Sequence, residues 1–130
     1  MATLIPYLLV GLGGFIGANA RFVVARLVGA LVDTRFPLGT FVINVSGSFL
    51  LGVLGALATH KFAPNSESMR LALGVGFLGA FNTFSTFEFE THALLDDGSW
   101  LLATTNIFAS LFVGLLAVRA GIVLAKTWLT

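Results

Sequence analysis

Four long apolar stretches, separated by short polar segments, make up most of the chain. Each is close to the roughly 20 residues that an α-helix needs to cross the hydrocarbon core of a bilayer. We therefore predict four transmembrane helices, over residues 4–28, 39–59, 69–94 and 100–126. No linker or second domain interrupts the pattern, so residues 1–130 are predicted to form a single all-α transmembrane domain.

The second stretch carries a polar stripe along an otherwise apolar helix. Thr40, Asn44 and Ser48 follow one another at a spacing of four, which places them on one helical face. Asn44 is the most costly of the three to bury in hydrocarbon, because its amide needs hydrogen-bond partners that lipid cannot supply. Two roles stay open for it. It bonds to another helix, or it serves a pore by donating to a passing anion or by holding a residue that lines the path.

The third stretch has the composition of a broken helix. Gly74, Gly76 and Gly79 come before Asn82 and Thr83. Irregular backbone at membrane depth is tolerated where it is buried in protein or lines a cavity. We predict that this helix breaks near the bilayer midplane and that carbonyl groups freed at the break can bind a cation.

Two phenylalanines follow the break at helical spacing. Phe84 and Phe87 stand three residues apart and so share one helix face, while Ser85 and Thr86 offer hydroxyl donors on neighbouring faces. Aromatic rings have a negative face and a positive edge, so ring edges beside hydroxyl groups favour an anion. The alternative is that both rings only pack, among the 13 phenylalanines of the chain.

The first and fourth stretches add small and polar residues. Gly13 and Gly17 form a pair at a spacing of four that lets another backbone come close, and Arg21 lies on the same face. Arg21 is interpreted either as a side chain that reaches the membrane interface or as a fixed cation in a vestibule, and this stretch alone favours the interface. Ser110 lies with Asn106 in a second polar stripe.

Composition places the chain in a membrane. Hydrophobic residues make up 57% of it and charged residues 10%, against about 25% charged residues in soluble domains. The net charge of +1 gives no basic surface for nucleic acid, and the absence of cysteine excludes disulfides and thiolate metal sites. No basic segment or cleavage site accompanies the first apolar run, so we expect that run to be retained.

Ionisable side chains are missing from the centres of the predicted spans, and Glu90 lies near the far interface. Proton-coupled transporters commonly use an acid or a histidine at membrane depth, so passive permeation is favoured over pumping. A small four-helix drug or cation antiporter would need an acid in its first helix, and no acid precedes Asp33. A non-transport assembly subunit agrees with the glycines and with Asn44 but does not explain the order TFSTF. The serines have no histidine at comparable depth, so we do not expect an enzyme.

Residues 79–90 read GAFNTFSTFEFE. This segment resembles the third-helix signature of the Fluc, or CrcB, family of fluoride channels, usually written GGxTTFSTFxxE. Residues 13–21 resemble the first-helix glycine and arginine motif of that family, residues 39–47 its GTxxxN motif, and residues 110–121 its fourth helix. The resemblance covers nearly the whole chain, and TFSTF after a glycine-rich segment is a specific signature.

The family consists of small four-helix membrane proteins that export fluoride passively and pair as antiparallel dimers around a central sodium ion. The resemblance therefore implies a channel of a prokaryotic inner membrane whose partners are fluoride, structural sodium, the lipid bilayer and a second copy of the chain. By this resemblance, the sodium ion would bind the backbone carbonyls of Gly79 and Asn82. The residues expected along the fluoride path are Phe84, Phe87, Asn44, Ser85, Thr86, Ser110, Thr40, Arg21 and Glu90.

Two residues depart from the family pattern at the break. Ala80 replaces the second glycine, and Asn82 stands where the family usually has Thr or Ser. A carbonyl ligand does not depend on the side chain, so we expect sodium binding to survive Asn82. Two interpretations stay open for Ala80: it is harmless, or it narrows the backbone conformations that are available at the break.

Basic residues are divided almost evenly between the two sides of the predicted spans, four against three. The side of the amino terminus has Lys61, Arg70, Arg119 and Lys126, and the other side has Arg21, Arg26 and Arg35. Orientation in a membrane follows the bias in Lys and Arg, which is nearly absent here. Independently of the resemblance, this predicts insertion both ways and an antiparallel, dual-topology homodimer.

Overall fold

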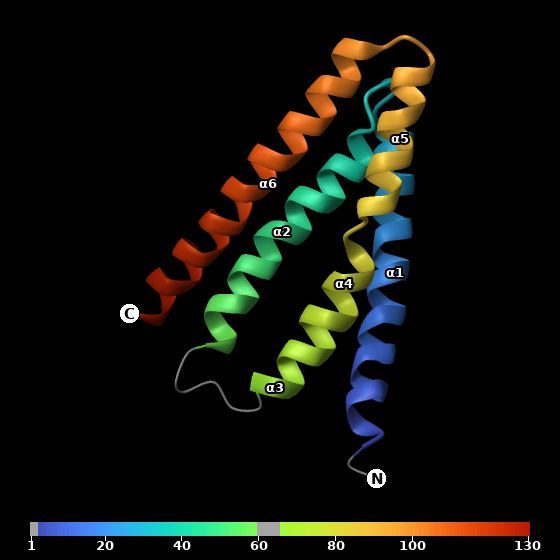
Figure 1. Ribbon diagram of the computed structural model, residues 1–130. Coiled ribbons are helices and arrows are strands. Elements are labelled where there is room, and N and C mark those ends of the chain that lie inside the picture. Colours follow the sequence, from blue (N-terminus) through green and yellow to red (C-terminus); the bar gives the residue numbers. More distant parts are fainter. Residues whose placement is uncertain (1–2, 60–65) are drawn as a thin grey trace.

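The computed structural model describes residues 3–59 and 66–130, and this part of the chain contains helices and no strand (Figure 1). Three long helices correspond to the first, second and fourth apolar stretches. They are α1 (Ile5–Leu31), α2 (Leu38–Ala58) and α6 (Trp100–Leu129). The third stretch is divided into α3 (Ser66–Met69), the π-helix η1 (Arg70–Leu78), α4 (Gly79–Phe81) and α5 (Phe84–Asp96).

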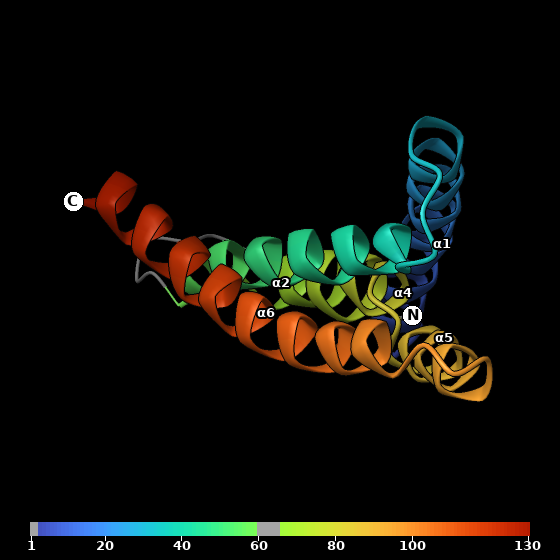
Figure 2. The same ribbon diagram turned by 90° about the horizontal axis from the view of Figure 1, so that it is seen from above.

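Two helix pairs organise the molecule. α6 packs along α2, and α1 packs along η1 and α4. Figure 2 shows α2 and α6 side by side, with α1 at one end of this pair. α5 continues from α4 toward the end of the molecule where the turn into α6 lies (Figure 1).

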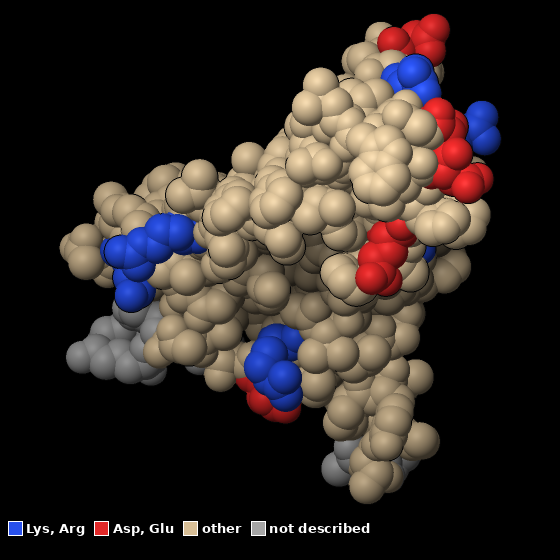
Figure 3. All heavy atoms as spheres, turned by 45° about the horizontal axis from the view of Figure 1, so that its top comes forward, with Lys and Arg blue, Asp and Glu red and all other residues tan. Residues whose placement is uncertain are grey.

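The surface has the character of a protein in lipid. Of the described helices, α1, α2 and α6 are each long and apolar enough to cross a membrane. Large apolar side chains such as Phe15, Leu101 and Leu116 are exposed along them. Figure 3 shows few charged side chains on one face, mainly toward its edges, around a wide uncharged area.

Close backbone contacts hold each helix pair together. A Cβ atom on Gly17 would lie 2.1 Å from the carbonyl oxygen of Phe77 in η1, and one on Gly13 would lie 2.0 Å from that of Ala72. The prediction that this glycine pair admits another backbone is confirmed, and the backbone it admits is that of η1. Gly121 does the same for α6, since a Cβ there would lie 2.2 Å from the carbonyl oxygen of Phe49. In a membrane such close packing replaces the hydrophobic drive that joins helices in water.

An ion pair joins the loop between α1 and α2 to the turn between α5 and α6. The Arg35 guanidinium donates to a carboxylate oxygen of Asp97 at 3.0 Å and also to the Ser99 hydroxyl. Hydrogen bonding from the Ser99 side chain, followed by that from Arg35, lowers the pKa of Asp97 below its ordinary value. The carboxylate is therefore ionised at neutral pH, and its stabilising contribution is lost only as the pH falls through that lowered pKa.

Candidate functional site

The third stretch breaks at two residues, as predicted. α4 ends at Phe81 and α5 begins at Phe84, while Asn82 and Thr83 between them are extended. Asn82 has ψ 149°, and Thr83 has φ −144° and ψ 112°. These angles are those of extended backbone, so the helical hydrogen-bond ladder cannot continue through this point.

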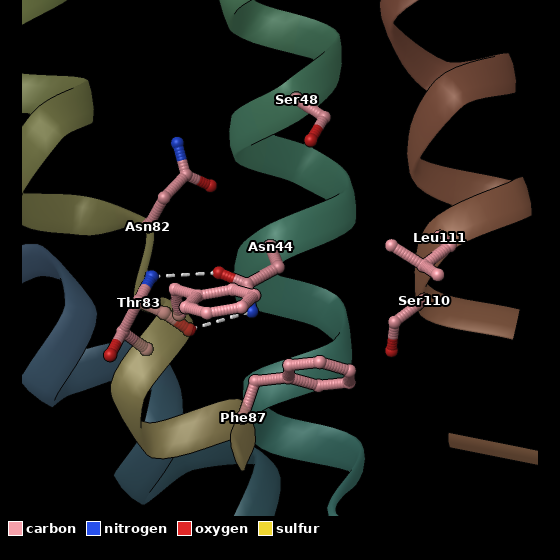
Figure 4. Close-up of a pocket in the computed structure, with 8 residues that line it drawn as sticks. Asn44, Ser48, Asn82, Thr83, Phe87, Ser110 and Leu111 are labelled. Atoms are coloured by element: carbon pink, nitrogen blue, oxygen red, sulfur yellow. Dashed lines mark hydrogen bonds between the residues drawn. The ribbon is translucent and has the colours of Figure 1, made fainter. Parts of the chain in front are cut away.

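The Asn44 side chain of α2 replaces the missing ladder at Thr83. Its Oδ1 accepts a hydrogen bond from the Thr83 N–H at 2.8 Å, and its Nδ2 donates to the Thr83 carbonyl at 3.0 Å (Figure 4). One amide thus pairs both backbone polar groups of the extended residue. Of the two roles left open for Asn44, the structure shows the bond to another helix, and it is made at a residue that lines a pocket.

Thr83 also starts α5. Its Oγ1 accepts from the Thr86 N–H at 3.3 Å and donates to the Thr86 hydroxyl at 2.9 Å. This is the side-chain cap that threonine commonly provides at the first turn of a helix. Thr83 was predicted as part of the break but not as the cap of α5, although threonine is a common residue at the start of a helix.

The same bonds leave two backbone carbonyls without their usual partners. In a continuous helix the Gly79 carbonyl would accept from the Thr83 N–H, which here donates to Asn44. The Asn82 carbonyl would likewise accept from the Thr86 N–H, which here donates to the Thr83 hydroxyl. Both carbonyls keep lone pairs that a cation can use.

A pocket of about 240 Å³ lies between the break, α2 and α6 (Figure 4). It brings together residues from three parts of the chain that lie far apart in sequence: α2, the break with the start of α5, and α6. The lining residues are Asn44, Ser48, Asn82, Thr83, Phe84, Phe87, Ser110 and Leu111. None of these eight side chains is ionisable, so the pocket offers hydroxyl and amide groups but no fixed charge.

The two phenylalanines share one wall of this pocket, which confirms that they occupy one face of the helix. The ring centroids of Phe84 and Phe87 lie 5.9 Å apart and the rings are tilted by 40°. Phe84 is exposed and Phe87 is half-buried. Ring edges have a positive potential and ring faces a negative one, so edges of these rings turned into the pocket would suit an anion better than a cation.

Other residues predicted along the path lie outside this pocket. The Arg21 Nε donates to the Ala80 carbonyl at 3.1 Å, so the guanidinium caps the end of α4. Thr40 is buried, Ser85 is exposed, and the Thr86 hydroxyl is bonded to Thr83. A role of these four residues in permeation stays a prediction.

Glu90 lines a different pocket, between α5 and the loop that precedes α2. Arg35, Pro37 and Asp97 lie around it, and the volume is about 380 Å³. The Oε1 atom of Glu90 is buried and has no hydrogen-bond partner among the described residues. The role of Glu90 in permeation likewise stays a prediction.

We predict that Asn44→Leu destabilises the protein because both backbone groups of Thr83 lose their partner. Leaving a buried polar group unpaired costs about 1–3 kcal/mol, so two such groups should lower the melting temperature in detergent by several degrees. Ser48→Ala is the matched control, because it alters a neighbouring pocket side chain and keeps both bonds to Thr83. Equal melting temperatures for the two variants would show that the Asn44 bonds do not support the break.

Comparison with known proteins identifies the relatives of this chain. Residues 8–122 match the family model described as CrcB-like protein, Camphor Resistance (CrcB). Proteins named fluoride-specific ion channel FluC are similar over almost the whole length. The one from Solibacter usitatus is 42% identical over 120 residues, which cover 92% of this chain and 98% of the relative.

Two further relatives with the same name extend this similarity. The protein from Hydrogenovibrio crunogenus is 49% identical over 113 residues, which cover 87% of this chain and 85% of the relative. The protein from Ruminiclostridium cellulolyticum is 40% identical over 127 residues, which cover 98% and 97%. With the family model matching most of the chain and three helices suited to crossing a membrane, this integral membrane protein belongs to the CrcB family.

Proposed function

We propose that the chain forms a fluoride-selective channel that lets fluoride leave the cell passively. The observation that carries the proposal is the uncharged pocket in which the two phenylalanine rings face the hydroxyl and amide groups of α2 and α6. We choose fluoride over other halides because the relatives are named fluoride-specific channels. Ring edges by themselves do not distinguish one halide from another.

The pocket chemistry fits an ion that must be held briefly and then released. The positive edges of Phe84 and Phe87 attract an anion without a fixed charge. Hydroxyl and amide donors such as Ser48 and Asn44 replace part of its hydration shell. Binding of this strength permits permeation, whereas a lysine or arginine in the pocket would hold the ion more tightly.

The remaining polar residues extend the proposed path beyond the pocket. Ser85 and Thr86 lie between the two phenylalanines in the first turn of α5, and Thr40 lies one turn before Asn44 on α2. Arg21 adds a positive charge beside the break. Glu90 lines the second pocket, between α5 and the loop that precedes α2. We assign these five residues to the approaches of the path.

A structural sodium ion is proposed at the break, on the backbone carbonyls of Gly79 and Asn82. Its support is that both carbonyls lose their helical donors, to Asn44 and to the Thr83 hydroxyl. The neighbouring Ala80 carbonyl accepts a hydrogen bond from Arg21 and is therefore not assigned to the ion. Sodium would supply the positive charge that neutralises exposed carbonyl oxygens, and it takes no part in moving fluoride.

The assembly proposed is an antiparallel homodimer of chains that insert both ways into a prokaryotic inner membrane. It requires that η1, α4 and α5 together make the third of four crossings, so that both ends of the chain lie on one side. The even division of Lys and Arg supports this, since it gives little preference for either orientation. If the two carbonyls lie near the two-fold axis, the second copy contributes the same two carbonyls. A cation there would then have oxygen ligands from both copies.

We predict that purified protein in liposomes releases fluoride when potassium efflux balances the charge, and releases little chloride. Phe84→Ile and Phe87→Ile should each lower fluoride release by about tenfold or more, the factor that corresponds to about 1.4 kcal/mol of lost stabilisation. Isoleucine keeps bulk but has no ring edge. The measurement is initial efflux per folded dimer with a fluoride electrode.

Phe89→Ile is the matched control for this experiment. Phe89 lies on the same helix, is 78% exposed and does not line the pocket, so its variant should conduct like the parent. Parent protein that releases chloride as fast as fluoride would contradict selectivity. If both isoleucine variants at the pocket conduct like the parent, the two rings only pack and take no part in permeation.

The topology has its own test in a single introduced cysteine. The chain has no cysteine, so Ser66→Cys carries the one thiol and the parent gives the labelling background. With unbiased insertion, about half of the protein should react with an impermeant reagent applied to intact cells. Labelling of nearly all or nearly none would show one fixed orientation and exclude the antiparallel dimer.

A further inference from the structure

A directed chain of hydrogen bonds runs behind the pocket from α6 to α5. The Ser110 hydroxyl donates to Asn106 Oδ1 at 3.2 Å, and Asn106 Nδ2 donates to the Thr91 hydroxyl at 2.8 Å. The Thr91 hydroxyl in turn donates to the Phe87 carbonyl at 2.7 Å. The two ends of this chain, Ser110 and Phe87, line the pocket, whereas the two middle residues do not.

Asn106 is buried more completely than almost any other side chain. It is 1% exposed, and both ends of its amide are paired. Thr91 is 7% exposed. A buried amide whose oxygen and nitrogen are both hydrogen-bonded links α5 to α6, and that link alone is sufficient reason for its presence. The direction of the bonds adds a second consequence, at the pocket.

A serine hydroxyl has one hydrogen to donate. In this arrangement the hydrogen of Ser110 is committed to Asn106, so Ser110 presents only oxygen lone pairs to the pocket. Lone pairs repel an anion. Ser110 can serve fluoride only if its hydrogen is released from Asn106.

Rotation of the Asn106 amide by half a turn releases that hydrogen without leaving any group unpaired. The amide oxygen and nitrogen exchange places at nearly constant volume. Thr91 then donates to Oδ1, Nδ2 donates to the Ser110 oxygen, and the Ser110 hydrogen is free to point into the pocket. The Phe87 carbonyl keeps its regular helical partner, the Thr91 N–H of α5.

We propose that Asn106 is a positioning residue whose amide sets the direction of the Ser110 hydroxyl and turns when an anion enters the pocket. The inference rests on the proposed function and deepens it, because it makes Ser110 a donor only while an anion is present. Thr91 is the fixed partner that serves both orientations, since a hydroxyl both donates and accepts.

The test compares fluoride efflux per folded dimer in matched variants. Ser110→Ala removes the donor. Asn106→Leu leaves the Ser110 hydroxyl to bond back to its own helix, as serine commonly does. Each should lower efflux by about tenfold, and the double variant should be no slower than the slower single variant because both act on one hydrogen. Thr91→Ser keeps the hydroxyl and should conduct like the parent, whereas Thr91→Val should be slow.

A spectroscopic measurement on the parent protein covers the case in which a variant does not fold. With ¹⁵N-labelled asparagine, the Asn106 side-chain amide signal should move on addition of fluoride, and it should not move with chloride or in Ser110→Ala. Parent protein that passes no fluoride would refute the proposed function itself. Parent protein that passes fluoride while the Asn106 signal stays fixed, or losses that multiply in the double variant, would overturn this inference alone.

Discussion

Inside a membrane each backbone N–H and C=O needs a partner within the protein, because an unpaired group in hydrocarbon costs several kcal/mol. Thr83 is extended, so its own helix cannot pair it, and the Asn44 side chain does so from α2. A side-chain amide has the donor and the acceptor that one peptide unit requires. These two hydrogen bonds therefore make a break in the third stretch energetically tolerable within the membrane.

The features proposed to serve fluoride follow from that break. Because the helix restarts at Phe84, the two rings turn toward the space between α2 and α6. Because the Thr83 N–H is taken by Asn44, the Gly79 carbonyl becomes available for a cation. Arg21 limits this effect by covering the next carbonyl, that of Ala80. This one contact thus separates the side of the break that carries the two rings from the side that carries the freed carbonyls.

Local sequence signals predicted the parts of the site that depend on helical spacing. The shared face of Phe84 and Phe87 and the break after Gly79 are confirmed, since both follow from periodicity and from glycine. The partner of Asn44 could not be predicted, because it lies 39 positions away and depends on how α2 meets the break. The buried bond from Asn106 to Thr91 depends likewise on the packing of two helices. The π-helical form of η1 was not predicted, and no local sequence signal in Arg70–Leu78 accounts for it.

The support of the break by Asn44 is tested most directly by measuring which atom pairs with the Thr83 amide nitrogen. Solid-state NMR on protein in lipid, with ¹⁵N in threonine and ¹³C in the asparagine side chain, reports this through dipolar coupling. We predict a measurable through-space coupling between the Thr83 nitrogen and the Asn44 side-chain carbonyl carbon, because the carbonyl oxygen lies 2.8 Å from that nitrogen. Absence of that coupling, together with ¹³C-glycine coupling that places the Thr83 nitrogen against the Gly79 carbonyl, would show a continuous helix and contradict the account.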